Sequence, residues 1–188
     1  MNEGVFDSFP ILNTSRLTIR QITEADDSGL LEVLSDEVTC KYLTHNTVND
    51  LITIRKLING MQMFFEEKQR IRWGIAENEN NYLIGHCGFF EIDKANCCAE
   101  ISYCLKSSFY GNGIMTEALN EMLKFGFYCY GLNRIVANVI SDNKGSIRVL
   151  QKLGFINEGL LPEGLHKNGQ VYDLIMFSIL KRDFISKD

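Results

Sequence analysis

The sequence has few of the features that mark membrane, secreted or metal-binding proteins. No apolar run approaches the roughly 20 residues that span a bilayer, which excludes a membrane-spanning helix. The opening segment MNEGVFDSFP has no basic stretch followed by an apolar one, so we expect no secretory signal and a cytoplasmic protein. With only three histidines, and no C-x-x-C pair among six cysteines, the spacing of a zinc site is absent and we expect no metal.

The composition is that of one globular domain. Lys and Arg number 19 against 24 Asp and Glu, giving a net charge of −5 with no basic tail, so we expect neither nucleic acid nor a membrane as partner. Hydrophobic residues make up 45% of the 188, enough to bury a core, and no repeat or linker divides them. We therefore expect a single domain over residues 1–188 whose cysteines are free and mostly buried thiols.

Hydrophobic periodicity and turn signals predict a mixed α/β (α+β) fold, with a mixed central sheet and helices on both of its faces. Thr23-Glu24-Ala25-Asp26 indicates a capping box before a short helix that buries Leu30, Leu31 and Leu34, and Thr47-x-x-Asp50 a second box before a longer one. Further helices are expected at 114–130 and 143–153, and strands at 17–20, 71–76, 82–92, 99–105, 134–140, 155–161 and 171–180.

The most informative junction is the Gly-x-Gly turn formed by Gly111, Asn112 and Gly113, between a predicted strand and a predicted helix. Two glycines let the backbone turn tightly and approach a ligand, and the free amides at a helix start suit a pyrophosphate. A plain tight turn is the alternative. No Gly-Lys-Ser/Thr follows, which excludes a Walker P-loop, and Thr116 replaces the third glycine of a dinucleotide-binding fingerprint.

Several short segments occur before and after this junction in a characteristic order. Together they resemble the GNAT superfamily of acetyl-CoA-dependent N-acetyltransferases. Within that superfamily the chain most resembles the ribosomal-protein N-terminal acetyltransferases, which modify the α-amino group of serine or alanine. The resemblance runs from about Leu12 to Phe184. Its segments are NTSRLTIR at 13–20, AEISYCL at 99–105, YGNGIMTEA at 110–118, GLNRI at 131–135, DNKGS at 142–146, LGFINEG at 153–159 and NGQVYD at 168–173.

The resemblance implies how acetyl-CoA would bind. The sheet would splay between the strands at 99–105 and 134–140, so that the backbone of Ile101, Ser102 and Tyr103 pairs with the pantetheine arm. Asn143 would contact that arm, although it could also simply cap its helix. The phosphate loop would comprise Ser108, where the family usually has Gln or Arg, together with Tyr110, Gly111, Asn112, Gly113, Ile114, Met115 and Thr116.

Acetyl transfer to an amine needs a base for the amine and a donor for the departing thiolate. An α-amino group has a pKa of about 8, so a carboxylate acting through water suffices. We expect Glu100 to be that base, with Glu91 and His86 in reserve, because Glu100 lies on the strand expected to border the cleft. Some members of the family have a glutamate at the position that aligns with Leu165, so the family's base is absent, shifted or replaced by Glu100 here. Ser146 would donate to the thiolate, or Tyr110 or Tyr103 would do so instead. The amine would attack directly, without a covalent enzyme intermediate.

The acceptor stays open at this point. A protein N-terminus, a small amine such as a polyamine or aminoglycoside, and a CoA-binding sensor without turnover are three readings of the same fold. The acceptor groove is expected from the segments 35–48 and 160–170, and a homodimer through the late strands is possible.

Overall fold

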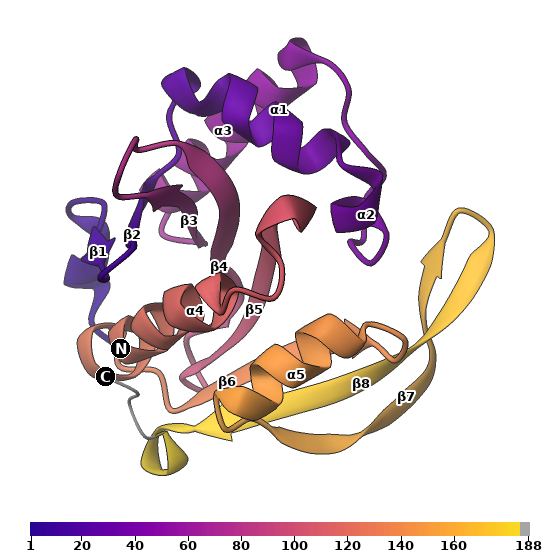
Figure 1. Cartoon of the computed structure of the whole chain (residues 1–188). Coiled ribbons are helices and arrows are strands. Elements are labelled where there is room, and N and C mark those ends of the chain that lie inside the picture. The colour runs from indigo at the N-terminus through magenta and orange to yellow at the C-terminus, as the bar shows by residue number, and fades with distance from the viewer. Residues whose placement is uncertain (185–188) are drawn as a thin grey trace.

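The computed structural model describes residues 1–184, and its centre is a single eight-stranded sheet in the order β1-β2-β3-β4-β5-β6-β8-β7 (Figure 1). All neighbouring strands are antiparallel except β5 and β6, which are parallel. The strands are β1 (Leu12–Asn13), β2 (Leu17–Gln21), β3 (Ile71–Glu77), β4 (Leu83–Asp93), β5 (Cys98–Leu105), β6 (Arg134–Ile140), β7 (Ile156–Lys167) and β8 (Gln170–Leu180).

Helices cover both faces of the sheet, which confirms the predicted architecture (Figure 1). On one face, Leu30 of α1 and Ile54 of α3 pack with Cys104 of β5; we call this the α1–α3 face. On the other, the α4–α5 face, Leu119 and Leu150 join the main core. The helices are α1 (Asp27–Ser35), α2 (Glu37–Cys40), α3 (Leu51–Glu66), α4 (Ile114–Lys124), continued by a π-helix (Phe125–Tyr130), and α5 (Lys144–Lys152). No helix within residues 1–184 is long and apolar enough to cross a membrane.

One of the two predicted capping boxes is confirmed and the other is wrong. The Asp26 carboxylate accepts the N–H of Thr23 at 2.8 Å, in a 3₁₀ turn that leads into α1. At α3 the N-cap is Asp50, whose carboxylate accepts the N–H of Thr53 at 2.8 Å. Thr47 lies outside that helix because Asp50 already supplies the cap, three residues before the amide it satisfies.

The late strands are longer than predicted, and the prediction of a loop at 160–170 is wrong. β7 continues to Lys167 and β8 begins at Gln170, so most of that segment is a β-hairpin. Asn168 and Gly169 form its tip, with φ of 51° and 74°. Asn-Gly with two positive φ values is the signal of a type I′ hairpin turn, and it was overlooked in the sequence.

The sheet parts between β5 and β6, as predicted. The two strands pair only at Cys98↔Arg134, Ala99↔Ile135 and Glu100↔Val136. Beyond Glu100, β5 stays paired with β4 as far as Leu105, and β6 stays paired with β8 as far as Ile140. Within residues 1–184, the edges of β5 and β6 that face each other therefore have no strand partner beyond this point.

Candidate functional site

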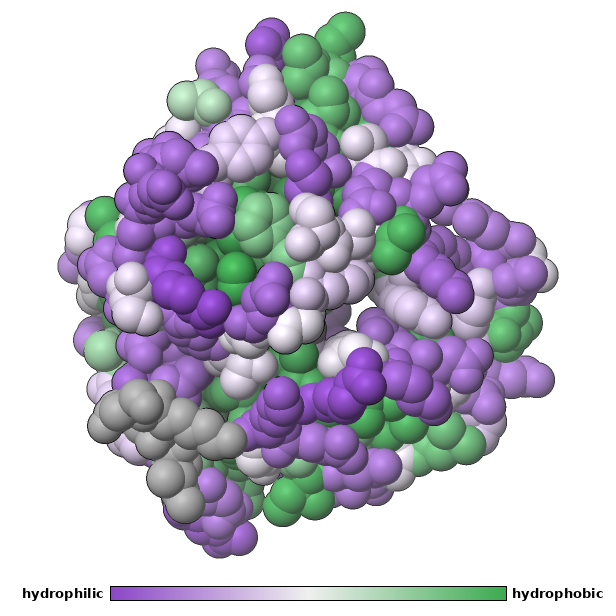
Figure 2. All heavy atoms as spheres, viewed as in Figure 1, coloured by the Kyte–Doolittle hydropathy of each residue, from purple (hydrophilic) through white to green (hydrophobic). Residues whose placement is uncertain are grey.

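A cavity of about 650 Å³ opens where β5 and β6 separate. Figure 2 shows this face hollowed between α2 and α5, with hydrophilic side chains at the rim. Both Tyr103 and Cys104 line it, although neighbouring residues of a strand point to opposite faces of the sheet. The cavity therefore passes through the split, from the α4–α5 face to the segment around Thr39 and Tyr42 on the other side.

One wall of the cavity is the glycine bend before α4. Gly111 and Gly113 have φ of 81° and 76°, a region that favours glycine, and a Cβ on Gly111 would meet no atom within 4 Å. Gly113 occupies the N-cap position of α4 and has no side chain to cap it. The first-turn amides of α4 are thus left for a ligand, and the helix dipole adds positive potential there. The bend is suited to a phosphate group.

Arg16 fixes the shape of the bend from a distant part of the chain. Its Nη1 donates to the carbonyl oxygen of Asn112 at 3.0 Å, and its Nε donates to Glu117 Oε2 at 2.7 Å. Glu117 lies in the first turn of α4, where a carboxylate is favoured by the dipole. The arginine was not predicted as a functional residue, because nothing local in the sequence connects it to a loop almost 100 positions later.

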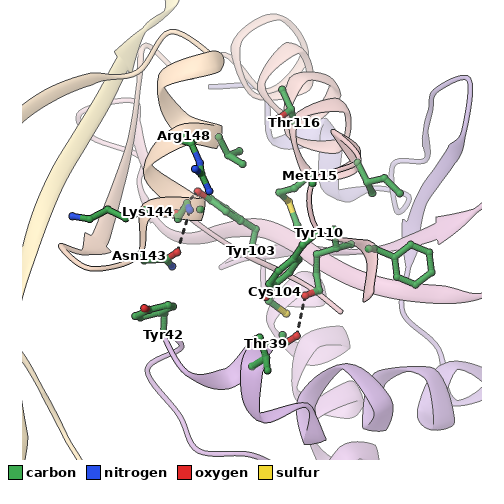
Figure 3. A pocket seen from close by; sticks show the side chains of 18 of the residues that line it. Thr39, Tyr42, Tyr103, Cys104, Tyr110, Met115, Thr116, Asn143, Lys144 and Arg148 are labelled. Carbon is green, nitrogen blue, oxygen red and sulfur yellow. Dashed lines mark hydrogen bonds between the residues drawn. The ribbon is translucent and has the colours of Figure 1, made fainter. Parts of the chain in front are cut away.

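The opposite wall carries positive charge from α5. Lys144, Arg148 and Lys152 line the cavity and are spaced four residues apart, so they share one side of the helix. In Figure 3, Lys144 and Arg148 project from α5 beside Asn143, across the cavity from Met115 and Thr116 of α4. This charged row was missed in the sequence, although its i, i+4, i+8 spacing is visible there. An anion between the two helices would be held from both sides.

Tyr103 and Ser146 meet across the split. The two hydroxyl oxygens are 2.6 Å apart, which joins β5 to the first turn of α5. Burial raises the pKa of Tyr103 above its usual value, so this phenol keeps its proton at neutral pH. Asn143 is the N-cap of α5, accepting the Ser146 N–H at 3.1 Å, and it also lines the cavity. The cap and a ligand contact are therefore compatible.

Glu100 lies at the apex of the split, with its side chain on the α1–α3 face. It is the last β5 residue to pair with β6, and it shares its face with Ser102 and Cys104. Burial raises its pKa above the usual value; a hydrogen bond from Asn138 of β6 works against this rise, and the nearby Glu91 adds to it. A half-buried carboxylate with a raised pKa is suited to accept a proton. Asn138 was not predicted.

Two other titratable groups are poor candidates for the chemistry. Burial, helped by the nearby Arg72, keeps the pKa of His86 well below 6.5, and its ring is only 3% exposed. Burial raises the pKa of the Cys104 thiol to about 12, so little thiolate is present at neutral pH. Neither group has the activation that a base or a nucleophile requires.

Some of the remaining predicted site residues line the cavity, and others lie outside its lining. Ser102 hydrogen-bonds Arg72, Ile101 is buried in the core, Ser108 lies in a 3₁₀ turn, and Asn112 offers its carbonyl to Arg16. Within residues 1–184, no group of three or more His, Cys, Asp or Glu side chains could hold a metal ion. The predicted residues that line the cavity are Tyr103, Tyr110, Gly111, Gly113, Ile114, Met115, Thr116, Asn143 and Ser146.

Comparison with known proteins places this geometry in context. Residues 16–156 match the family described as an acetyltransferase (GNAT) domain. The uncharacterized N-acetyltransferase YoaA of Bacillus subtilis is 35% identical over 173 residues, covering 92% of this chain and 98% of that protein. The putative ribosomal N-acetyltransferase YdaF of the same organism is 34% identical over 102 residues, covering 54% and 56%.

A solved structure has the same fold. The ribosomal L7/L12 α-N-protein acetyltransferase RimL, in complex with coenzyme A, superposes with a TM-score of 0.83. The match covers 91% of this chain and 98% of that chain at 23% sequence identity.

The glycine bend yields a prediction about ligand affinity. Replacing Gly111 by valine places a branched side chain in the open space of the bend and strains a φ of 81°. We expect the Kd for coenzyme A, measured by calorimetry, to rise at least about tenfold, which corresponds to about 1.4 kcal/mol.

The matched control is Gly169→Val at the hairpin tip, where φ is 74° and the space around the residue is equally open. Both variants carry a backbone strain of about 1–3 kcal/mol, but only the first should lose affinity. Equal affinities for coenzyme A in the two variants would refute the assignment of the bend to phosphate.

Proposed function

This chain belongs to the GNAT family of acetyltransferases, and from that premise we propose that it acetylates the N-terminal α-amino group of a protein, with ribosomal proteins as the first candidates. The acetyl donor is acetyl-CoA, as in GNAT N-acetyltransferases. The observation that carries the proposal is the cavity at the split, which has a phosphate-type bend in one wall and the basic residues of α5 in the other.

The residues of the cavity fit acetyl-CoA. The first-turn amides of α4 and the basic row of α5 would hold the diphosphate from two sides. The edge of β5 from Ile101 to Tyr103, unpaired toward β6, would bond the pantetheine arm as an added strand. The thioester supplies the activated acetyl group, and its sulfur would lie beside Ser146.

Glu100 would take the proton of the amine from the α1–α3 face, directly or through one water. It is the last residue of β5 that pairs with β6, and by strand alternation it shares its face with Cys104, which lines the cavity. The Asn138 side chain, on the neighbouring strand β6, lowers the pKa of this carboxyl and partly offsets the effect of burial. An α-amino group, with a pKa of about 8, needs only this modest help. Leu165, at the position of the family's glutamate, has no group that could serve instead.

Ser146 would donate its hydroxyl proton to the departing thiolate. The two hydroxyl oxygens are 2.6 Å apart, and the phenol keeps its proton. With the phenol donating to the serine oxygen, the serine proton would be available to the thiolate. A backbone N–H of β5 at the split would polarise the acetyl carbonyl.

The entrance to the α1–α3 side supports a narrow acceptor such as a chain end. Lys167 on the β7–β8 hairpin donates to the carbonyl of Cys40 at 3.0 Å, and Asn168 donates to the Asn46 side chain at 2.8 Å. The hairpin tip and the segment between α2 and α3 therefore contact each other. These are the two segments expected to form the acceptor groove. An N-terminal peptide fits such a frame better than a lysine on a folded surface.

Release of free thiol from acetyl-CoA tests the proposed function. We expect release with short peptides that carry a free N-terminus, and none when that N-terminus is blocked. Small amines such as spermidine should be poorer acceptors by kcat/KM. Preference for small amines would assign the protein to that substrate class, and coenzyme A binding without any thiol release would make it a sensor.

The role of Glu100 predicts a distinct pH profile. Because the carboxylate is the active form, activity should fall as pH decreases through its raised pKa. Glu100→Gln should lower kcat/KM about 10²–10⁴-fold and remove this acid limb. Glu91→Gln, at the residue paired opposite Glu100, is the matched comparison. A large loss in Glu91→Gln with a small loss in Glu100→Gln would transfer the role to Glu91.

The Tyr103–Ser146 contact predicts that the two residues act as a unit. Ser146→Ala should lower kcat with little change in the Kd for coenzyme A. Tyr103→Phe removes one hydrogen bond of about 0.5–1.5 kcal/mol, so we expect a two- to tenfold loss of kcat. In the Ser146→Ala background the tyrosine substitution should add almost nothing. Additive losses in a double-mutant cycle would show that Tyr103 does not act through the serine.

A further inference from the structure

Arg72 of β3 lies on the α1–α3 face without a carboxylate partner in the part of the chain that the structure describes. Its Nη2 donates to Ser102 Oγ at 3.3 Å, and within residues 1–184 it forms no ion pair. Gly88 stands between Arg72 and Ser102 in the register of the three strands. Because this glycine has no side chain, the guanidinium can reach across β4 to β5. A half-buried cation without a counterion is unfavourable unless a group of opposite charge binds it.

A second arginine reinforces the positive charge. Arg70 lies two residues before Arg72, so both are on the same face of β3. Its guanidinium is 4.5 Å from the ring centre of Phe64 and 4.4 Å from that of Phe90, and it too forms no ion pair within residues 1–184. Its charge acts on Arg72, so the two cations are near each other. Together they make this part of the face attractive to an anion.

The acidic groups of the same face lie apart from these cations. Ser102, which Arg72 reaches, is two residues from Glu100 on β5, a separation of about 7 Å along the strand. Glu91 is paired opposite Glu100, and the groups that act on Glu100 are Asn138 and Glu91, not Arg72. The face therefore presents carboxylates at one end and guanidinium groups at the other, without an ion pair joining them.

Asn138 adds an unsatisfied acceptor at the acidic end. Its side chain acts on the pKa of Glu100, and within residues 1–184 its buried Oδ1 has no hydrogen-bond partner. An amine nitrogen beside Glu100 would supply the missing donor. The donors left over on Arg72, in turn, call for an acceptor with negative charge.

We propose that the acceptor carries a carboxylate as well as its amine, with the amine at Glu100 and Asn138 and the carboxylate at Arg72 and Ser102. The proposal rests on the acetyltransferase activity of the proposed function and concerns the chemistry of its acceptor. A free amino acid and a peptide with an acidic first residue share this chemistry. A polyamine does not, because it would place a second positive charge against two arginines.

Matched acceptors test the proposal on the unmodified protein. Thiol release is measured with peptides that begin with Asp or Asn, with Glu or Gln, and with free amino acids beside their amides. In one of these arms we expect kcat/KM to be at least about tenfold higher for the acid than for its neutral partner. The arm that shows the preference identifies the source of the carboxylate.

Equal or lower kcat/KM for the acids in every arm would overturn the carboxylate while leaving the acetyltransferase function intact. Absence of release with every acceptor would overturn both.

Arg72→Gln locates the preference. We expect the ratio of kcat/KM between acid and neutral acceptors to fall close to one in this variant. Arg55→Gln is the matched control, since Arg55 is an exposed residue of α3 that pairs with Asp27, and the ratio should persist there. A thermal melt shows whether Arg72→Gln is folded. A folded Arg72→Gln variant that keeps the preference for acidic acceptors overturns the assignment of the carboxylate to Arg72. If the variant is unfolded, the comparison of acceptors on the unmodified protein tests the proposal.

Discussion

The separation of β5 and β6 after Glu100 is the constraint on which the site depends. β5 stays paired with β4, and β6 stays paired with β8. The backbone groups of β5 and β6 that face the gap therefore receive no hydrogen bond from the opposite strand after Glu100. Buried backbone N–H and C=O groups are nearly always bonded to something. On the proposed function, the pantetheine arm would bond these groups as an added strand, with its diphosphate at the starts of α4 and α5.

The split also allows one active site to use both faces of the sheet. Phosphate-type contacts, from the glycine bend and the basic row of α5, lie on the α4–α5 face. Glu100, Asn138 and Arg72 lie on the α1–α3 face. An acceptor would enter on this face, near the contact between the β7–β8 hairpin and α2. On the proposed function, donor and acceptor would approach from opposite sides of the sheet and meet at the gap between β5 and β6.

Local signals predicted the elements and the cavity wall, whereas contacts between distant segments could not be predicted. The Gly111 bend and the Asn143 cap depend on neighbours in the chain, and the splay followed from the family resemblance. Arg16 at the bend and Arg72 beside Ser102 act through strand register and tertiary packing, which spacing alone does not show. The hairpin tip at Asn168 had a readable local signal that was overlooked.

The alternation of β5 assigns the chemistry of each residue, so its register is critical. Tyr103 faces Ser146 across the gap, while Glu100 and Ser102 face the acceptor side, and a slip of one residue would exchange the two sets. A bulge in β4 shifts the pairing between Phe89 and Glu91, so that Glu91 comes to lie opposite Glu100. The bulge therefore places a second carboxylate beside Glu100, one of the causes that raise its pKa. An irregularity in a neighbouring strand thus tunes the group at the apex of the split.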